Sequence, residues 1–174
     1  TPIIGAGIPV TNWQRTSDPL PGLPAAAQGH IWMAPLPAGV KRPTSLFMDT
    51  QMLRRARSAG FEPAARYKDH QTHLTDLVCP QGVLQAWDNP HDIDLVIVPH
   101  FPWVMNVLPL ESVDPANNIA TTSVPATYAL DRKVFGHFPD GTAWFENVFE
   151  GMSGPGDWVC RTASKALYLW HEGD

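Results

Sequence analysis

The strongest periodic signal in the chain lies between residues 49 and 60, where apolar side chains recur every three or four positions. Asp49 is a suitable N-cap residue, and Gly60 can adopt the left-handed conformation that often ends a helix. This spacing predicts one amphipathic helix. Four residues would form its apolar face: Met52, Leu53, Ala56 and Ala59.

From residue 94 onward the pattern changes to short apolar runs that are typical of strands. Residues 94–98 and 103–110 are mostly apolar and predict two buried strands broken by Pro-His-Phe-Pro. Segments 127–138 and 142–151 are joined by Pro-Asp-Gly, which favours a hairpin, and 157–171 predicts a further strand. The last fifty residues are therefore expected to form an antiparallel meander of three strands.

The segment around residue 80 has two interpretations. Residues 73–79 and 82–87 suit two short strands separated by a turn. Pro80 also suits the first position of a short helix capped by Cys79. The pattern does not decide between them.

The first 45 residues differ in composition from the rest of the chain. Eight prolines and five glycines separate short apolar pieces there, and such a composition favours loops and extended structure over helices. We expect residues 1–45 to form a proline-rich extended arm packed on a body of residues 46–174. The expected fold is a single α+β domain, mostly antiparallel sheet or a small barrel with one amphipathic helix, with an all-β fold as the alternative.

Charge is scarce and unevenly distributed along the chain. Only 17% of the 174 residues are charged and 18 are proline, which argues against a mostly helical protein. The net charge is −5, but residues 41–68 carry +5 and residues 69–174 carry −10. The basic stretch is either the solvated face of the expected helix or an anion-binding patch for phosphate or RNA, with contacts through Arg54, Arg55 and Arg57.

Two cysteines, Cys79 and Cys160, are too few for a cysteine-rich zinc site. They can form one disulfide that closes a loop of about 80 residues. Pairing would favour a location outside the cytoplasm. In a reducing compartment both would instead be small buried side chains.

The most apolar stretch, residues 95–110, is nearly long enough to span a membrane. Pro99, Pro102 and Pro109 interrupt it, and each removes a helical hydrogen bond. We therefore expect no membrane span.

The sequence Gly-Met-Ser-Gly-Pro-Gly at 151–156 places Ser153 among glycines, as in some serine hydrolases. Only 21 residues follow the serine, too few for the remaining strands of a chymotrypsin-like barrel. No helix is predicted after it, as a nucleophile elbow would require. We expect a turn here and no catalytic role for Ser153.

Glu146, Arg161 and His171 are the preferred catalytic candidates, because on antiparallel strands their side chains would converge. A glutamate can take a proton from a ribose 2′-OH, an arginine can hold phosphate charge, and a histidine can protonate the leaving oxygen. In residue types this set is similar to that of the small microbial ribonucleases and related bacterial toxin domains, over about the last thirty residues. The non-catalytic interpretation is a cross-strand ion pair between Glu146 and Arg161.

Two further catalytic hypotheses use other residues. A thiol enzyme would use Cys79, activated at a helix start, with His100 as its base, or His137 or His171 in its place. A metal enzyme would use Asp69, His70 and His73 as ligands for zinc or iron. The sequence holds none of the common glycine-rich nucleotide motifs and does not identify a cofactor.

Two classes of function are consistent with these patterns. The first is a non-catalytic interaction or structural module in a larger assembly, indicated by the proline-rich segment, the seven tryptophans and the lack of a complete catalytic motif. Its partner would be another protein or a second copy of the chain. The alternative is a hydrolase, with a ribonuclease-type phosphodiesterase preferred over the thiol enzyme and the metal enzyme.

Overall fold

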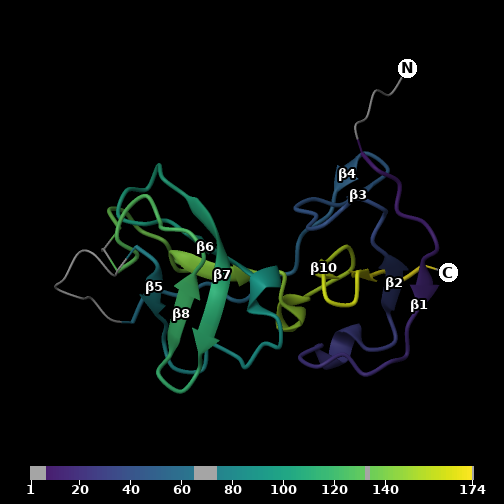
Figure 1. The fold of residues 1–174 in the computed structure, drawn as a ribbon, viewed down its shortest axis with the longest axis horizontal. Coiled ribbons are helices and arrows are strands. Elements are labelled where there is room, and N and C mark those ends of the chain that lie inside the picture. Colours follow the sequence, from purple (N-terminus) through teal and green to yellow (C-terminus); the bar gives the residue numbers. More distant parts are fainter. Residues whose placement is uncertain (1–6, 65–73, 132–133, 174) are drawn as a thin grey trace.

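A computed structural model describes residues 7–64, 74–131 and 134–173. Within these ranges the protein consists of short strands joined by loops and three 3₁₀ turns (Figure 1). The strands are β1 (Gln14–Arg15), β2 (Ile31–Pro35), β3 (Phe47–Met48), β4 (Gln51–Met52), β5 (Asp76–Val78), β6 (Asp94–Ile97), β7 (Asn106–Asp114), β8 (Ile119–Thr122), β9 (Ala143–Glu146), β10 (Trp158–Arg161) and β11 (Ala166–Trp170). The 3₁₀ turns are η1 (Ala25–Ala27), η2 (Pro90–Asp92) and η3 (Phe149–Gly151).

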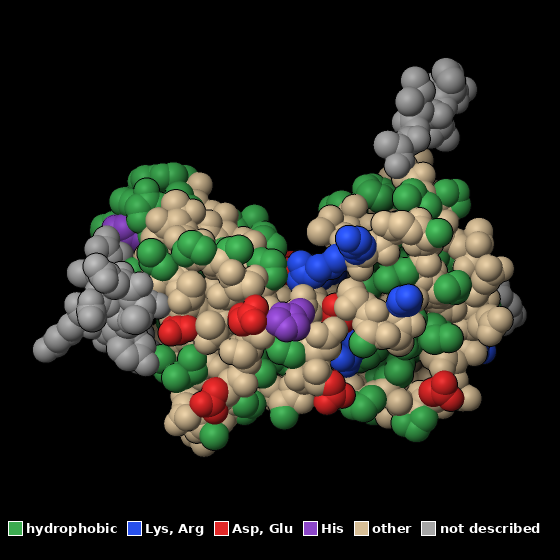
Figure 2. Space-filling model, in the orientation of Figure 1, with side chains coloured by type: hydrophobic (Ala, Val, Ile, Leu, Met, Phe, Trp, Pro, Cys, Tyr) green, Lys and Arg blue, Asp and Glu red, His purple; other side chains and the backbone are tan. Residues whose placement is uncertain are grey.

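The strands form two lobes, each built on an antiparallel sheet (Figure 1). The first lobe has the strand order β5-β8-β7-β6-β9 and comes from the middle of the chain. The second has the order β1-β2-β11-β10, with the hairpin β3–β4 beside it. Figure 2 shows a notch between the lobes, with Lys and Arg side chains gathered at its base. The prediction of antiparallel sheets is confirmed.

One face of the five-stranded sheet carries the core of the first lobe. Leu95, Ile97 and Phe145 are fully buried there. Because side chains alternate along a strand, Trp144 and Glu146 lie on the opposite face. We call this opposite face the outer face, and it also carries Asp94, Val96 and Val107.

The four-stranded sheet is packed on both faces. Trp158 and Leu167 belong to one apolar cluster, while Val159 and Tyr168 belong to another on the opposite face. Burial on both faces explains the continuous apolar sequence of β11, which is a central strand between β2 and β10. The N-terminal part of the chain supplies β1 and β2 to this sheet, and a division of the chain at residue 45 stays a prediction.

The expected helix between residues 49 and 60 is wrong, and with it the α+β fold; the all-β alternative describes the fold. Asp49, with a φ of 54°, lies in the turn of the β3–β4 hairpin instead of capping a helix. The chain then runs extended from residue 53 to residue 61. The backbone N–H of Ala56 donates to the Trp158 carbonyl at 2.9 Å, and that of Phe61 donates to the Ala143 carbonyl at 2.7 Å.

The apolar spacing in this segment reflects its passage between the two lobes. Leu53 and Ala56 pack into clusters on opposite faces of the four-stranded sheet. Met52, expected on the buried helix face, is 65% exposed, whereas Arg55, expected in solvent, is 8% exposed. Successive side chains of this extended segment pack against different parts of the protein. Its apolar positions therefore recur every three or four residues although the segment is not a helix.

The expected three-strand meander is not formed, because β9 pairs with β6 while β10 pairs with β11. After Glu146 the chain leaves the first sheet, passes through η3 and the turn at 151–156, and enters the second sheet at Trp158. The predicted hairpin partner of β9, segment 127–138, contains no strand in its described residues. A period of two identifies a strand but not the neighbour with which it pairs.

The segment around residue 80 contains the short strand β5 and then a loop, with no helix at Pro80. Cys79 lies in the core of the first lobe and Cys160 in a cluster of the second, each as a free thiol. Of the two alternatives left open for the cysteines, a disulfide is not formed, and both are small buried side chains. Across residues 7–64, 74–131 and 134–173, the structure contains no helix with the length and apolar character needed to cross a membrane.

Candidate functional site

The candidate site lies on the outer face of the five-stranded sheet, at the edge formed by β9. Residues 55–62 run beside this strand, and the backbone N–H of Ser58 donates to the Phe145 carbonyl at 2.8 Å. Arg57 and Glu146 form a bridge pair across the same edge. Paired residues share a face, so Arg57 lies on the outer face with Trp144 and Glu146.

Trp144 is held between Arg57 and Glu146. The guanidinium carbon of Arg57 lies 5.3 Å from the centroid of the Trp144 ring, a cation–π arrangement. The indole Nε1 donates to Glu146 Oε1 at 3.1 Å. The Glu146 side chain is 26% exposed, and its Oε2 lies 3.9 Å from Arg55 Nη1. These contacts orient an indole and a carboxylate at a surface that a ligand can reach.

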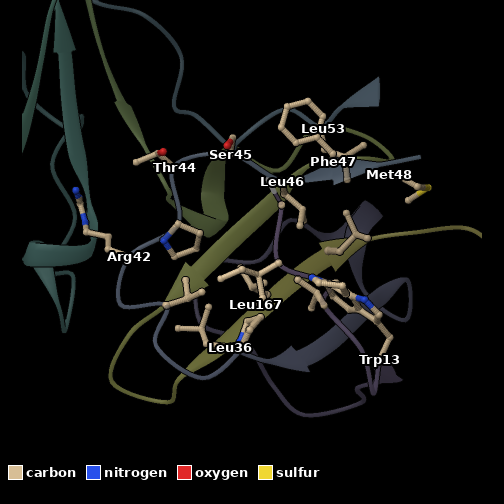
Figure 3. A pocket seen from close by; sticks show the side chains of 18 residues that line it. Trp13, Leu36, Arg42, Thr44, Ser45, Leu46, Phe47, Met48, Leu53 and Leu167 are labelled. Atoms are coloured by element: carbon tan, nitrogen blue, oxygen red, sulfur yellow. The ribbon is translucent and has the colours of Figure 1, made fainter. Parts of the chain in front are cut away.

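A buried ion-pair network lies next to this surface, where the two lobes meet. The Asp94 carboxylate, 2% exposed, accepts hydrogen bonds from Arg55 Nη1 and from Arg42 Nη2, the latter at 2.8 Å. Arg55 Nη2 also donates to the Asp92 carbonyl at 3.2 Å. Figure 3 shows Arg42 set apart from the apolar side chains of the second lobe, with its guanidinium directed toward the first. Charge-assisted hydrogen bonds therefore connect the lobes close to Glu146.

A second polar cluster joins the two sheets through Asn147, which follows β9. Asn147 has a φ of 71°, and its Nδ2 donates to the carbonyls of Asp92 at 2.8 Å and Cys160 at 2.7 Å. The Asp92 carboxylate accepts from Thr162 Oγ1 at 2.6 Å and from the Thr162 backbone N–H at 2.9 Å. The buried polar groups of Asn147 and Asp92 are thus hydrogen-bonded across the junction, which helps to hold the lobes in one arrangement.

A hollow of about 830 Å³ opens beside Trp144. Two facing segments line it, residues 57–62 and 138–141, together with the Trp144 side chain. Each segment contributes one exposed carboxylate, Glu62 from the first and Asp140 from the second. We call this space the Trp144 hollow. It combines an aromatic ring, a guanidinium group and two carboxylates.

Close backbone contact brings the two carboxylates to the same hollow. An added Cβ on Gly60 would lie 1.8 Å from the carbonyl oxygen of Asp140, so only glycine fits at this position. Thr142 Oγ1 donates to Glu62 Oε2 at 2.9 Å, which restrains the glutamate side chain. The shape of the hollow therefore depends on a backbone contact and one side-chain hydrogen bond.

Comparison with known proteins adds one finding. No family model matches the sequence, and no curated protein matches it. A solved structure named "Glycoside hydrolase" matches with a TM-score of 0.58 and 16% sequence identity, over 97% of this chain and 29% of that one. The chain shares its fold with part of a glycoside hydrolase. It spans about three tenths of the length of that structure, and at this identity the likeness shows the fold alone.

The three residues of the ribonuclease hypothesis lie in separate surroundings. Glu146 belongs to the candidate site, whereas the Arg161 guanidinium carbon lies 4.9 Å from the centroid of the Phe149 ring. Arg161 pairs with Ala166 in the β10–β11 hairpin, and His171 follows five residues later, about 16 Å along the strand. The structure does not bring these three side chains together around one anion.

The residues of the thiol and metal hypotheses lie elsewhere. Cys79 is 1% exposed, and burial raises the pKa of its thiol to about 12, so the thiol stays protonated near neutral pH. His100 contacts a group of aromatic rings. Asp69, His70 and His73 lie outside the described residues. Within the part of the chain that the structure describes, no group of three or more His, Cys, Asp or Glu side chains could hold a metal ion.

The three arginines of the predicted anion patch have different partners. Arg54 Nε donates to Asp157 Oδ1 at 2.7 Å, Arg55 pairs with Asp94, and Arg57 covers Trp144. A contact with phosphate or RNA through them stays a prediction.

The sequence patterns did not indicate Arg57, Glu62 and Asp140 as residues of one site. It did place Trp144 and Glu146 on one strand face by their period of two, and the structure joins these two by a hydrogen bond. The Asp-Gly pair at 140–141 signalled a turn, but no local pattern indicated that residue 60 packs against it. The missed residues are long-range neighbours.

The turn at 151–156 forms as expected, around the Asp157 carboxylate. This group accepts hydrogen bonds from the backbone N–H of Ser153 at 2.7 Å and of Gly154 at 3.2 Å, and from Arg54. Burial opposes the charge of Asp157, but the hydrogen bonds and the Arg54 charge outweigh it and lower its pKa below the ordinary value. Asp157 is thus engaged in holding the turn.

Asp157→Asn is expected to lower the melting temperature near neutral pH, because asparagine cannot pair with the Arg54 charge. Since the native pKa of Asp157 lies below its unfolded value, the stability that this carboxylate adds is present above about pH 4 and is lost as pH falls further. The melting temperatures of wild type and variant should therefore converge toward about pH 3, as followed by calorimetry. A difference that stays constant over this range would contradict the assignment.

The second lobe has an apolar groove of about 750 Å³ (Figure 3). Trp13, Leu46 and Leu167 are among its lining side chains, and Phe47 of the β3–β4 hairpin lies beside them. Its one charged lining residue among those described, Arg42, is engaged with Asp94. The groove offers mainly apolar contact, with the hydroxyl groups of Thr44 and Ser45 as its uncharged polar side chains, and no carboxylate or histidine among its described lining residues.

Proposed function

We propose that this chain is a module of a hydrolase that acts on glycans, and that the Trp144 hollow binds a sugar unit. The observation that carries the proposal is the make-up of the hollow, in which an indole, a guanidinium and two carboxylates line one space. A sugar has an apolar ring face edged by hydroxyl groups, so it needs both kinds of contact. The shared fold with part of a glycoside hydrolase supports the choice of a glycan.

Four of the lining residues have a role in this proposal. The part of the half-buried Trp144 indole that Arg57 leaves uncovered packs against the ring face of the sugar. Glu62 and Asp140 accept hydrogen bonds from hydroxyl groups, and Arg57 donates them. Paired carboxylates are also the groups that glycoside hydrolysis uses, one as an acid and one as a base or nucleophile. Glu62 and Asp140 are therefore the hydrolytic candidates of this chain. The shared segment is 29% of the matched structure, so binding and bond cleavage are tested separately.

Trp144→Ala is expected to weaken glycan binding by about tenfold or more, because the variant loses the ring that packs on the sugar. Isothermal titration calorimetry with soluble xylan, laminarin, mixed-linkage β-glucan and polygalacturonate measures this effect. Phe47→Ala is the matched control, since Phe47 is 57% exposed in the other lobe and its loss should leave binding unchanged. Absence of binding to all four glycans, or equal binding by Trp144→Ala and wild type, would contradict the proposal.

The same mixtures are assayed for new reducing ends. Cleavage that is lost in Glu62→Gln while binding is retained assigns the chemistry to the Trp144 hollow, with an expected loss of about 100-fold or more. Binding without cleavage assigns this chain the role of a glycan-binding module.

A further inference from the structure

A group of aromatic rings forms an exposed surface on the first lobe. Trp103 is 77% exposed and Phe135 is 62% exposed, which is unusual for side chains of this size. Contiguous exposed apolar surface marks a binding site. We call this group the Trp103 platform, and its members are His100, Phe101, Trp103, Tyr128 and Phe135.

Stacking holds the Trp103 ring in position. Its centroid lies 4.9 Å from that of Phe101, with 20° between the ring planes. Phe101 in turn contacts Tyr128, with centroids 5.1 Å apart, and His100, at 4.2 Å. With one ring face on Phe101 and high exposure, Trp103 presents its other face to solvent.

The loops that carry the platform are tied together. The backbone N–H of Phe135 donates to the His100 carbonyl at 3.1 Å. Asn106 Oδ1 accepts from the Thr127 N–H at 2.9 Å, and Asn106 Nδ2 donates to Thr127 Oγ1 at 3.0 Å. A platform that is ordered before binding loses little conformational entropy when a ligand arrives.

An apolar strip leads from the platform toward the Trp144 hollow; it is exposed at Val107, whereas Val96, which lies between Val107 and Trp144, is 2% exposed. Val107 pairs with Val96, and Val96 pairs with Trp144, so the three form one row across the outer face. Trp144 and Val107 are two strand spacings apart, about 10 Å. From Val107, which is 54% exposed, the strip continues through Met105, 60% exposed, to Trp103. A ligand that contacts both Trp103 and Trp144 must therefore be extended. It must also present one ring face to each of the two tryptophans.

We infer that the Trp103 platform is a second contact for the same glycan, so that the module binds a polysaccharide chain in preference to a short sugar. This inference rests on the proposed function of the Trp144 hollow. The exposed side chains of Trp103 and Phe135 are uncharged aromatic rings, and each stacks on Phe101. Uncharged ring surface of this kind can pack against the apolar face of a sugar ring. Two linked contacts raise the affinity for a long ligand, because binding at one site holds the chain near the other.

The test compares a disaccharide, a hexasaccharide and the polymer of whichever test glycan binds best to wild type. Trp103→Ala is expected to weaken polymer binding by about tenfold and to leave disaccharide binding unchanged. Trp144→Ala should weaken binding of both. The exposure of Trp103 predicts that Trp103→Ala folds normally, which its melting temperature checks, and Phe135→Ala serves as a second platform variant.

The outcomes separate this inference from the proposed function. If Trp103→Ala binds polymer and disaccharide as wild type does, the inference is overturned while the Trp144 hollow stands. If it weakens both ligands equally, the preference for long chains is overturned. If wild type binds no test glycan, both proposals are overturned. If light scattering shows that Trp103→Ala changes only the association of the protein with itself, the platform is a protein contact and the inference is again overturned.

Discussion

Asp94→Asn is expected to lower the free energy of unfolding by about 3–5 kcal/mol. The Asp94 carboxylate is 2% exposed and holds the guanidinium groups of Arg42 and Arg55, and Arg55 itself is 7% exposed. Asparagine keeps the size of the side chain but removes its charge, so buried Arg55 keeps only Glu146, at 3.9 Å, as a counter-ion. Urea unfolding followed by circular dichroism measures the loss.

A control and a double variant make this prediction specific. Asp88→Asn, at an exposed position, is expected to change stability by no more than about 0.5 kcal/mol. Adding Arg55→Met to Asp94→Asn is expected to recover part of the loss, because the buried arginine charge that has lost Asp94 is then removed as well. A loss below about 1 kcal/mol for Asp94→Asn would mean that the network does not connect the lobes as described.

Gly60→Ala is expected to cost about 3 kcal/mol or more and to weaken glycan binding in the Trp144 hollow. The added Cβ would lie 1.8 Å from the Asp140 carbonyl oxygen, which is backbone and cannot turn aside as a flexible side chain could. Relief requires segments 57–62 and 138–141 to separate, which also breaks the hydrogen bond from Phe61 to Ala143. Thermal unfolding and glycan titration measure the two effects.

Gly154→Ala is the matched control for this steric effect. An added Cβ at Gly154 meets no atom within 4 Å, so the variant is expected to be as stable as wild type within about 0.5 kcal/mol. Wild-type stability in Gly60→Ala would show that the two segments are not in close backbone contact.

The sequence predicted strands more successfully than their partners. The apolar runs at 94–98 and 103–110 contain β6 and the first half of β7, since continuous burial leaves a clear signal in composition. The pairing of β9 with β6 left no such signal, because alternation shows that one face of a strand is buried but not against which strand. The change of sheet after Glu146 depends on long-range packing and could not be predicted locally.

The misassigned helix shows a second limit of local patterns. Helical spacing assumes that all apolar positions face one core, whereas Leu53, Ala56 and Phe61 pack into three different clusters. The burial of Arg55 depends on Asp94, 39 positions further along the chain. A buried charge with a distant partner looks the same in sequence as a solvated one.

The candidate site was predictable only where strand geometry determined it. A period of two placed Trp144 and Glu146 on one face, and that relation holds in the structure. Glu62 and Asp140 line the same hollow because Gly60 allows two backbone segments to touch. With no local signal for that contact, the hollow and its two carboxylates emerged only from the structure.

Pairing of β2 with β11 joins the two ends of the described chain, with Ile31 opposite Trp170. The five-stranded sheet of residues 76–146 can form as soon as that segment leaves the ribosome. In contrast, β2 can pair with β11 only after β11 has been synthesised. Contacts between residues so far apart in the sequence slow folding. Until β11 is available, the edge of β2 stays unpaired and can pair with another chain, which promotes aggregation. The strands that are made first are therefore expected to become ordered last.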